Sequence, residues 1–367
     1  MKVIVVSRCS WTLFNFRAGL MRALAARGVT VLGGGCGGDG YEVKVRELGL
    51  HFEDLPVDKK GINPWADLRL LYKMYRWYKT EKPDAVHHFT IKPVIYGSIA
   101  ARLAGVPKIV NTITGLGYVY TERGGILRYI VDTLYRLALA CASRVFFQNP
   151  DDRNLFIGTN LVAAAKATLV PGSGVDLSAF RAEPRDGAGT VVLMVSRLLR
   201  DKGVVEFAQA AKIAKAAMPL SEFWLLGGVD VRNPTAVSQE EADAWQSAGW
   251  LKLLGHRDDV SAVMAKADLV VLPSYREGAP RALIEAGAMG KALIATDVPG
   301  CREVVEHGVN GLLVPPRDHE SLAAAIITLL QDREFREAAG KASRLKMERQ
   351  FDERIVIARA FEAYGLQ

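Results

Sequence analysis

The chain has 367 residues, of which 50% are hydrophobic and 24% are charged, a balance that excludes disordered and fibrous classes. Its length suits two domains of ordinary size better than one core. Residues 1–183 carry 24 Lys and Arg against 15 Asp and Glu, and the remaining residues carry 23 against 25, so the net charges are +9 and −2.

Several partners are compatible with the positive charge of the first half. It could attract nucleic acid, anionic lipid or a phosphorylated substrate, or it could be a solvated surface without a role. No nucleic-acid-binding module accompanies the charge, so we do not expect nucleic acid as a partner.

Targeting and redox features favour a cytoplasmic protein. Cys9, Cys36, Cys141 and Cys301 show no metal-binding or redox spacing, and we interpret them as reduced packing residues. The start, MKVIVVSR, runs directly into a strand pattern without signal-peptide features. The longest apolar segment, residues 126–142, contains three charged residues, which predicts a packed helix and not a membrane span.

The first half alternates short β-rich runs with helical patterns, which predicts a doubly wound parallel sheet. The expected strands and helices are 3–6, 16–27 (helix), 29–32, 85–89, 96–104 (helix), 108–112 and 145–148. Glycine-rich GGGCGGDG at 33–40 follows the second strand and not the first, so we interpret it as a flexible loop at a cleft edge and not as a dinucleotide fingerprint.

Two segments of the first half leave alternatives open. The first loop, SRCSWTLFNFR, ends with Asn15 and Arg17 near a helix start, where they could receive an acceptor phosphate or simply cap the helix. Residues 65–82, WADLRLLYKMYRWYKTEK, form either a basic aromatic helix on anionic lipid or an ordinary helix with Leu68, Leu71 and Tyr75 in the core.

The alternation stops at RAEPRDGAGT, residues 181–190, which has the composition of a linker. It then restarts with the strands and helices 191–195, 204–217 (helix), 223–226, 251–254, 269–272, 280–289 (helix), 293–296 and 312–314. We therefore predict an α/β fold of two Rossmann-like domains facing across a cleft, residues 1–183 and 184–350. A helix within 351–367 is expected to cross back to the first domain. Ligands of such sheets bind at the carboxyl ends of the strands.

The sharpest motif is SYREGAPRALIEAGAMGKALIATDVPG, residues 274–300. Pro280 suits the first position of a helix, whose free amides favour a diphosphate, and Gly278 lets the backbone approach it. Glu277 and Glu285 could reach one ligand from different depths, or they could be a loop carboxylate and a surface residue paired with a neighbouring cation.

A second motif, VVLMVSRLLRDKG at 191–203, places Arg197 and Lys202 after a buried strand. Two cations there suit a diphosphate leaving group whose charge grows as its bond breaks. The alternative is a turn with solvated charges, but both motifs follow strand ends of one sheet, which favours a shared site.

These residues resemble the family 4 glycosyltransferases of the GT-B fold, which are retaining and need no metal. The similarity rests on SRLLRDKG at 196–203, EGAPRALIE at 277–285 and TDVPGCREVVEHGVNGLLVPPRD at 296–318, and it continues more weakly through the first half. The resemblance implies a nucleotide-diphosphate sugar as a substrate, no cofactor and no metal.

The resemblance also assigns roles to the residues of both motifs. Arg197 and Lys202 would neutralise the donor diphosphate, Glu285 would bind ribose hydroxyls and Glu277 would contact the donor sugar. The remaining donor-binding positions implied are Gly278, Ala279 and Pro280, with His256 and Arg257 of GHRDDV as base contacts.

Within the family, residues 83–105 and 112–121 resemble enzymes that extend undecaprenyl-diphosphate-linked sugars for O-antigen, capsule or glycoprotein glycans. This implies a lipid-linked saccharide acceptor, a peripheral position on the cytoplasmic face of the inner membrane and contact with anionic lipid. UDP and an N-acetylated hexosamine are the donor components we favour by resemblance alone.

One departure leaves the reacting centre open. Many members carry a His where this chain has Thr114 and Gly115, so Thr114, His88 or a backbone carbonyl could serve the reacting centre. His87 and His88 are adjacent on a strand and point to opposite faces, which argues against a metal pair. Either could be a buried structural residue, and His88 is our preferred site candidate.

The chain has no Asp-x-Asp triplet, which argues against a metal-dependent GT-A enzyme. We expect the acceptor hydroxyl to attack on the face from which the diphosphate leaves, with a phosphate oxygen taking its proton. The alternatives are a sugar-nucleotide epimerase or phosphorylase of the same fold and a non-catalytic nucleotide-sugar-binding protein.

Overall fold

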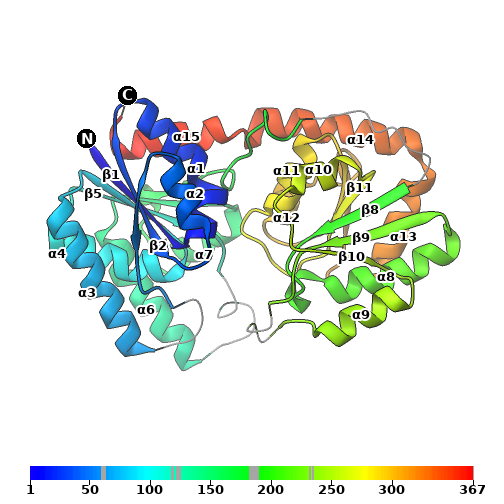
Figure 1. Cartoon of the computed structure of the whole chain (residues 1–367), viewed down its shortest axis with the longest axis horizontal. Helices are drawn as coiled ribbons and strands as arrows, with labels where there is room; N and C mark the ends of the chain where they lie inside the picture. The colour runs from blue at the N-terminus through cyan, green and yellow to red at the C-terminus, as the bar shows by residue number, and fades with distance from the viewer. Residues whose placement is uncertain are drawn as a thin grey trace. The chain divides into compact units, whose positions relative to one another are not determined.

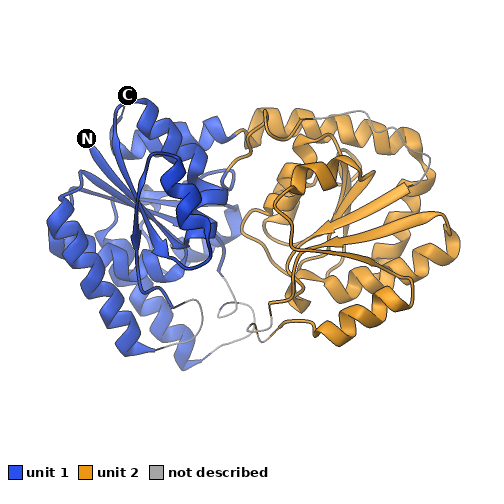
Figure 2. Ribbon diagram, in the orientation of Figure 1, with its two compact units in different colours: residues 1–173, 353–367 blue, residues 174–352 orange. Residues whose placement is uncertain are grey.

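The computed structural model describes residues 1–58, 63–116, 120, 125–181, 190–230, 233 and 235–366. The chain forms two compact units, unit 1 (residues 1–173 and 353–367) and unit 2 (residues 174–352), which Figure 2 shows in blue and orange. The change from unit 1 to unit 2 falls ten residues before the boundary predicted from the linker composition. The last helix belongs to unit 1.

In unit 1, the described residues build a seven-stranded parallel sheet in the order β3-β2-β1-β4-β5-β6-β7 (Figure 1). Its strands are β1 (Lys2–Cys9), β2 (Thr30–Cys36), β3 (His51–Asp54), β4 (Ala85–Phe89), β5 (Lys108–Ile113), β6 (Arg144–Phe147) and β7 (Ala167–Leu169). Its helices are α1 (Ser10–Ala26), α2 (Tyr41–Glu47), α3 (Pro64–Glu81), the π-helix η1 (Pro93–Gly97), α4 (Ser98–Ala104), α6 (Ile126–Cys141), α7 (Pro150–Gly158), the 3₁₀ turn η2 (Ala164–Lys166) and α15 (Glu353–Tyr364).

Two apolar layers cover this sheet because strand side chains alternate between its faces. Val3 and Val5 of β1 pack with α1 and α15, whereas Ile4 and Val6 pack with α3 and α4. Helix α6 continues the second layer over β5 and β6. Helices α3, α4 and α6 therefore lie on the face opposite α1 and α15 (Figure 1).

In unit 2, the described residues build a six-stranded parallel sheet in the order β10-β9-β8-β11-β12-β13. Its strands are β8 (Thr190–Val195), β9 (Ser221–Leu226), β10 (Lys252–Gly255), β11 (Leu269–Leu272), β12 (Ala292–Thr296) and β13 (Gly311–Val314). Its helical segments are η3 (Arg200–Lys202), α8 (Val204–Ala217), α9 (Gln239–Ser247), α10 (Val260–Ala265), α11 (Arg281–Ala288), α12 (Cys301–Val304), α13 (His319–Gln331), α14 (Arg333–Lys346) and η4 (Met347–Phe351).

The predicted α/β fold class is confirmed, and two local interpretations are wrong. Residues 33–36 of the glycine-rich segment continue β2 and are not loop; the ring of Trp77 and the side chain of Leu13 pack so closely on this strand that Cβ atoms at Gly33 and Gly34 would clash. Helix α1 begins at Ser10, so Asn15 and Arg17 lie in its second turn and not at its start.

Helix α15 is fixed to unit 1 by its last residue. The Tyr364 hydroxyl lies 2.5 Å from His87 Nδ1 on β4, and Lys108 Nζ of β5 donates to the Tyr364 carbonyl at 2.6 Å. In each contact, the two residues are more than 250 positions apart in the chain. They tie the end of the chain to the centre of the first sheet.

Candidate active site

In unit 2, two predicted site residues meet where the strand order reverses. Strands β8 and β11 are neighbours, but the chain continues from them to opposite sides of the sheet, and ligands of open α/β sheets bind at such points. Lys202 of η3 follows β8 and Glu277 follows β11. Lys202 Nζ lies 2.6 Å from Glu277 Oε1, and the Ser274 hydroxyl donates to the same oxygen at 2.7 Å.

Two glycines permit the close approach of these loops. Gly203 ends η3 at φ 73°, and a Cβ there would lie 2.1 Å from the Pro273 carbonyl oxygen. Gly300 has φ 87°, and a Cβ there would lie 2.5 Å from the Glu277 carbonyl oxygen. Only glycine combines this left-handed backbone with such small separations. The loop carrying Glu277 is thereby held between two backbones.

Glu285 lies in the second turn of α11, buried except for 8% of its surface. Its carboxylate pairs with Arg281, one turn earlier in the helix. Pairing with a neighbouring cation is one of the two alternatives that the sequence left open for Glu285. Pro280 is the residue before the helix and not its first residue. The first amides of α11, after Gly278 and Ala279, have no carbonyl acceptor within the helix and can bind an anion.

Arg197 lies two residues beyond β8, beside the end of β9. The Ser196 amide donates to the Leu226 carbonyl at 3.0 Å and the Leu198 amide to the Gly228 carbonyl at 3.1 Å, which fixes the backbone on both sides of Arg197. Its guanidinium donates to Asp230 at 3.0 Å and is about half exposed. The carboxylate of Asp230 was not recognisable from the sequence because it lies outside both motifs.

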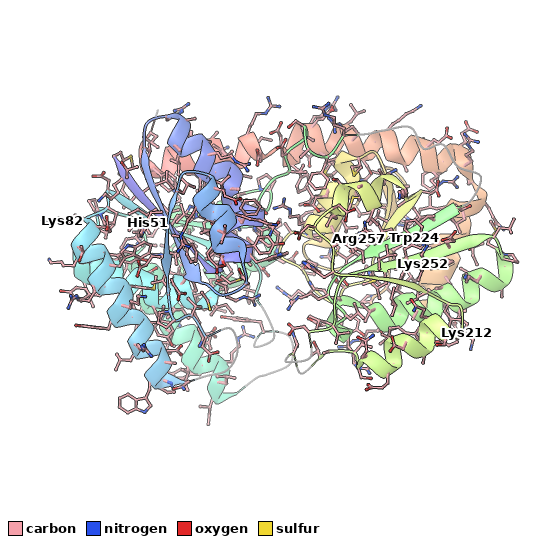
Figure 3. The ribbon with its side chains drawn as sticks, in the orientation of Figure 1. His51, Lys82, Lys212, Trp224, Lys252 and Arg257 are labelled. Carbon is pink, nitrogen blue, oxygen red and sulfur yellow. The ribbon has the colours of Figure 1, made fainter. Side chains whose placement is uncertain are left out.

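His256 and Arg257 follow β10 at the same edge of the sheet, and Figure 3 shows Arg257 beyond the end of the strand that Lys252 begins. The Gly227 amide donates to the Gly255 carbonyl at 2.9 Å, which joins this strand end to that of β9. Arg257 makes two hydrogen bonds to Asp259, and His256 lies 3.7 Å from Asp258. Both side chains are solvent-accessible, as a base contact requires.

In unit 1, the structure places His88 in the core. Its ring is fully buried between the Tyr78 hydroxyl and the Asn111 side-chain oxygen, each at 3.0 Å from a ring nitrogen. Burial lowers its pKa from 6.5 to about 4, although the hydrogen bond to Asn111 opposes that shift. The ring is thus neutral near pH 7. Its proposed place at the reacting centre stays a prediction.

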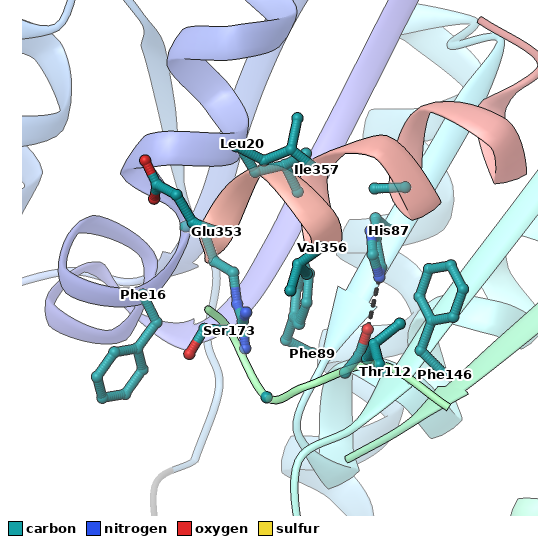
Figure 4. A pocket seen from close by; sticks show the side chains of 14 residues that line it. Phe16, Leu20, His87, Phe89, Thr112, Phe146, Ser173, Glu353, Val356 and Ile357 are labelled. Carbon is teal, nitrogen blue, oxygen red and sulfur yellow. Dashed lines mark hydrogen bonds between the residues drawn. The ribbon is translucent and has the colours of Figure 1, made fainter. Parts of the chain in front are cut away.

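His87, the neighbouring residue, points to the other face and lines a pocket between β4, α1 and α15 (Figure 4). Its Nε2 lies 2.7 Å from the Thr112 hydroxyl. The Arg17 guanidinium lies in the same pocket, 3.8 Å from the centre of the Phe89 ring. Burial lowers the pKa of His87 well below its usual value, and the charge of Arg17 lowers it further.

The remaining first-half candidates lie on α1 and after β5. The Asn15 side chain donates to the Trp11 carbonyl of its own helix at 3.0 Å, so it serves α1. Thr114 and Gly115 follow β5, and Gly115 has φ 123°. The functional roles expected for these residues stay predictions.

Two other residues mark the point where the unit 1 strand order reverses, between β1 and β4. Arg8 lies at the end of β1, and Thr90 follows β4 at φ 72°, a strained conformation for a β-branched residue. Arg8 Nε and Thr90 Oγ1 are buried without a hydrogen-bond partner among the described residues. Strain and unsatisfied polar atoms are not recognisable in a sequence, so neither residue was predicted.

Metal sites and membrane spans are both absent from the part of the chain that the structure describes. Its His, Cys, Asp and Glu side chains nowhere gather in threes as a metal site would need. None of its helices combines the length and apolar character needed to cross a bilayer.

Two Rossmann-like sheets that share one strand order over their first six strands, each with its own family match, define the protein as a glycosyltransferase of the GT-B fold class. Residues 178–346 match the family described as glycosyl transferases group 1, and residues 16–172 match the glycosyl transferase 4-like domain. The chain belongs to this family of glycosyltransferases, which confirms the family and the enzyme class expected from the motifs.

Two curated relatives extend the comparison. The chain is 28% identical to the N,N'-diacetylbacillosaminyl-diphospho-undecaprenol alpha-1,3-N-acetylgalactosaminyltransferase of Campylobacter jejuni, over 99% of this chain and 98% of the relative. It is 30% identical to the UDP-Gal:alpha-D-GlcNAc-diphosphoundecaprenol alpha-1,3-galactosyltransferase of Escherichia coli, over 76% and 74%. Among solved structures, Anabaena HepE in complex with UDP has a TM-score of 0.79 at 21% identity over the full length of both chains, which shows the fold alone.

Proposed function

We propose that this glycosyltransferase moves a sugar from a nucleotide-diphosphate donor to an undecaprenyl-diphosphate-linked saccharide in bacterial surface polysaccharide or glycan biosynthesis. The observation that carries the donor part is the contact between Lys202 and Glu277 at the unit 2 switch point. The C. jejuni and E. coli relatives support the acceptor, since both names specify a diphospho-undecaprenol saccharide. UDP is the favoured nucleotide and an N-acetylated hexosamine the favoured sugar.

In the proposed donor complex, the diphosphate lies at the amino end of α11 between Arg197 and Lys202. Both cations offset the charge that builds on the leaving group, and the helix amides add fixed dipoles. Glu285 binds the ribose, His256 and Arg257 contact the base, and Glu277 contacts the donor sugar. Glu277 also orients Lys202, because the two side chains share a short ion pair.

The proposed reaction retains the anomeric configuration and uses neither metal nor cofactor. The acceptor hydroxyl oxygen forms a bond to the anomeric carbon on the face from which the diphosphate departs. The bond from that carbon to the phosphate oxygen breaks, and the acceptor proton passes to a phosphate oxygen. The products are the nucleoside diphosphate and the lengthened saccharide, so atoms and charge balance without a separate base.

On the acceptor side, we propose that Arg8 and Thr90 contact the acceptor at the unit 1 switch point. A cation at a strand end suits a phosphate, and the ligand would satisfy polar groups that the described residues leave unpaired. Arg8→Ala should raise the KM for acceptor several-fold more than the exposed control Arg22→Ala on α1 does. Equal KM values for both variants would refute this assignment.

We propose that the protein is a peripheral membrane protein on the cytoplasmic face of the inner membrane. A lipid-linked acceptor stays in the bilayer, and the basic aromatic residues of α3 are the kind that attract anionic lipid.

Mass spectrometry provides the direct test of the activity. The purified protein is incubated with a panel of UDP- and GDP-sugars and a polyprenyl-diphosphate-linked saccharide, with and without EDTA. A product heavier by one sugar and unaffected by EDTA is expected. Conversion of the donor without acceptor would indicate an epimerase, and nucleotide-sugar binding without any product would indicate a non-catalytic protein.

A further inference from the structure

The outer surface of α3, α4 and α6 is unusually apolar. Among the described residues, fifteen large hydrophobic side chains are exposed, and eight of them lie on these three helices. They are Trp65, Leu68, Tyr72, Leu103, Ile126, Tyr129, Ile130 and Leu137. Large apolar side chains gathered on one face mark an interaction surface, whereas isolated ones are ordinary.

Most of these side chains gather at one edge of the sheet. Helix α3 follows β3 and helix α6 follows β5, so both helices begin at the carboxyl edge of the strands, where ligands of such sheets bind. Six of the eight lie in the first halves of α3 and α6, including Trp65 at 79% exposure and Ile126 at 81%. We call these six the apolar edge: Trp65, Leu68, Tyr72, Ile126, Tyr129 and Ile130.

Helix α6, which the sequence predicted to be a packed helix, buries one apolar face and exposes apolar side chains on the other. In α6, Tyr135, Ala138 and Leu139 face the core, and Tyr129 and Ile130 face solvent. In α3, the core face is Leu70, Met74, Trp77 and Tyr78. Of the three residues expected in the core, Tyr75 packs against it and Leu71 is half-buried, whereas Leu68 is exposed. Leu68 and Trp65 are turned outward instead.

The charge on these helices selects the partner. Among the described residues of α3, α4 and α6, every exposed charged side chain is basic, namely Arg69, Arg76, Lys79, Arg102 and Arg136. A second copy of the chain docked through the same surface would bring the same positive charge against it and would be repelled. An anionic bilayer complements it, with cations at the lipid headgroups and Trp and Tyr at the interface.

We infer that the apolar edge inserts into the interfacial layer of an anionic membrane while the basic residues behind it contact the headgroups. The inference rests on the proposed function for its purpose, since an inserted edge beside the ligand-binding ends of the strands would meet a lipid-linked acceptor where it leaves the bilayer. The proposed peripheral location leaves the membrane-binding surface open, and the apolar edge with its basic neighbours is that surface.

Vesicle flotation tests the surface directly. Purified protein is mixed with vesicles of phosphatidylglycerol and phosphatidylethanolamine, or of phosphatidylcholine alone, and the floating fraction is measured. Wild type should float with the anionic vesicles. Ile126→Ser with Ile130→Ser should weaken binding about tenfold or more, and Arg69→Glu with Arg76→Glu should do the same. The second pair should also reduce the dependence of flotation on salt.

The matched control is Leu220→Ser, an exposed leucine of unit 2 that lies outside this surface. It should float like wild type, and thermal melting should show that all variants are folded. The inference is overturned if wild type does not float, if Leu220→Ser loses as much binding as the α6 pair, or if the α6 pair changes the oligomeric state and not flotation. Transfer by wild type to a short-chain, water-soluble acceptor without vesicles tests the proposed function separately.

Discussion

The Lys202 ammonium and the Glu277 carboxylate lie 2.6 Å apart although 75 residues separate them in the chain. Their side chains are 22% and 12% exposed, so the pair is partly shielded from water. The ion pair joins the two sequence motifs into one site. It also means that a change in either residue alters the environment of the other.

Glu277→Gln tests this pair. The amide keeps the size of the side chain but removes the charge that orients Lys202, so the rate of transfer should fall by roughly a hundredfold or more. Binding of the nucleoside diphosphate, measured by calorimetry, should change little. The control is Glu320→Gln, the same change at an exposed position of α13. A transfer rate near that of wild type would show that Glu277 has been assigned wrongly.

Arg197→Ala should weaken donor binding because a cation facing the diphosphate is lost. Charge-assisted hydrogen bonds contribute roughly 1.5–3 kcal/mol, so the KM for the donor should rise by about tenfold to a hundredfold. Arg333→Ala removes another exposed arginine of unit 2, paired with Glu337, and serves as the control. Equal donor KM values for the two variants would contradict the prediction.

Gly300→Ala should disrupt the site through the main chain. The new Cβ would lie 2.5 Å from the Glu277 carbonyl oxygen, so the loop must move and transfer should be lost. Gly308→Ala is a close control, because Gly308 also has a positive φ, 76°, but a Cβ there would have nothing within 4 Å. Both variants carry the backbone strain and only one carries the clash. If both retain activity, the loop is not held as tightly as the structure indicates.

Tyr364→Phe should lower the free energy of unfolding. It leaves His87 Nδ1 buried without the hydroxyl 2.5 Å away, which costs about 1–3 kcal/mol. Urea denaturation measures the change, and Tyr129→Phe at an exposed hydroxyl is the control. Since units can unfold separately, the transition of unit 1 is the one to follow. A loss no larger than that of the control would mean that the contact adds little.

Stability should also fall in mild acid. The pKa of His88 is about 4 in the folded chain and 6.5 when unfolded, so between these values the unfolded state binds the extra proton. The stabilisation is complete above pH 6.5 and is lost as the pH falls toward 4, by about 3 kcal/mol at most. His87 contributes in the same direction. His88→Gln should flatten the profile between pH 7 and pH 5, and an unchanged slope would contradict this.

The sequence was sufficient for the architecture and for placing the two motifs at strand ends of one sheet, because apolar periodicity and strand-end residues are local signals. Strands β4 and β11 and helix α8 have the bounds predicted for them. The edge strands β3 and β7 were missed, since β3 is mostly polar (HFED) and β7 has only three residues. The β2 glycines were interpreted wrongly because their strand state depends on packing against Trp77, which lies far along the chain.

The contacts between side chains could not be predicted from the local sequence around each residue. Nothing near Glu277 in the sequence indicates that Lys202 will contact it, or that Asp230 will bind Arg197. The alternation of side chains along β4 predicted that His87 and His88 point to opposite faces of the sheet, and the structure agrees. The alternation could not indicate which face holds the pocket. That depends on α15, which comes from the other end of the chain.

The position of α15 affects how the protein is made. Residues 174–352 are contiguous, so unit 2 has its entire sequence before synthesis ends. Unit 1 begins first but lacks its last helix until residues 353–367 have left the ribosome. Until then β4 has no Tyr364 to cover His87, and the first unit to start is the last to be completed.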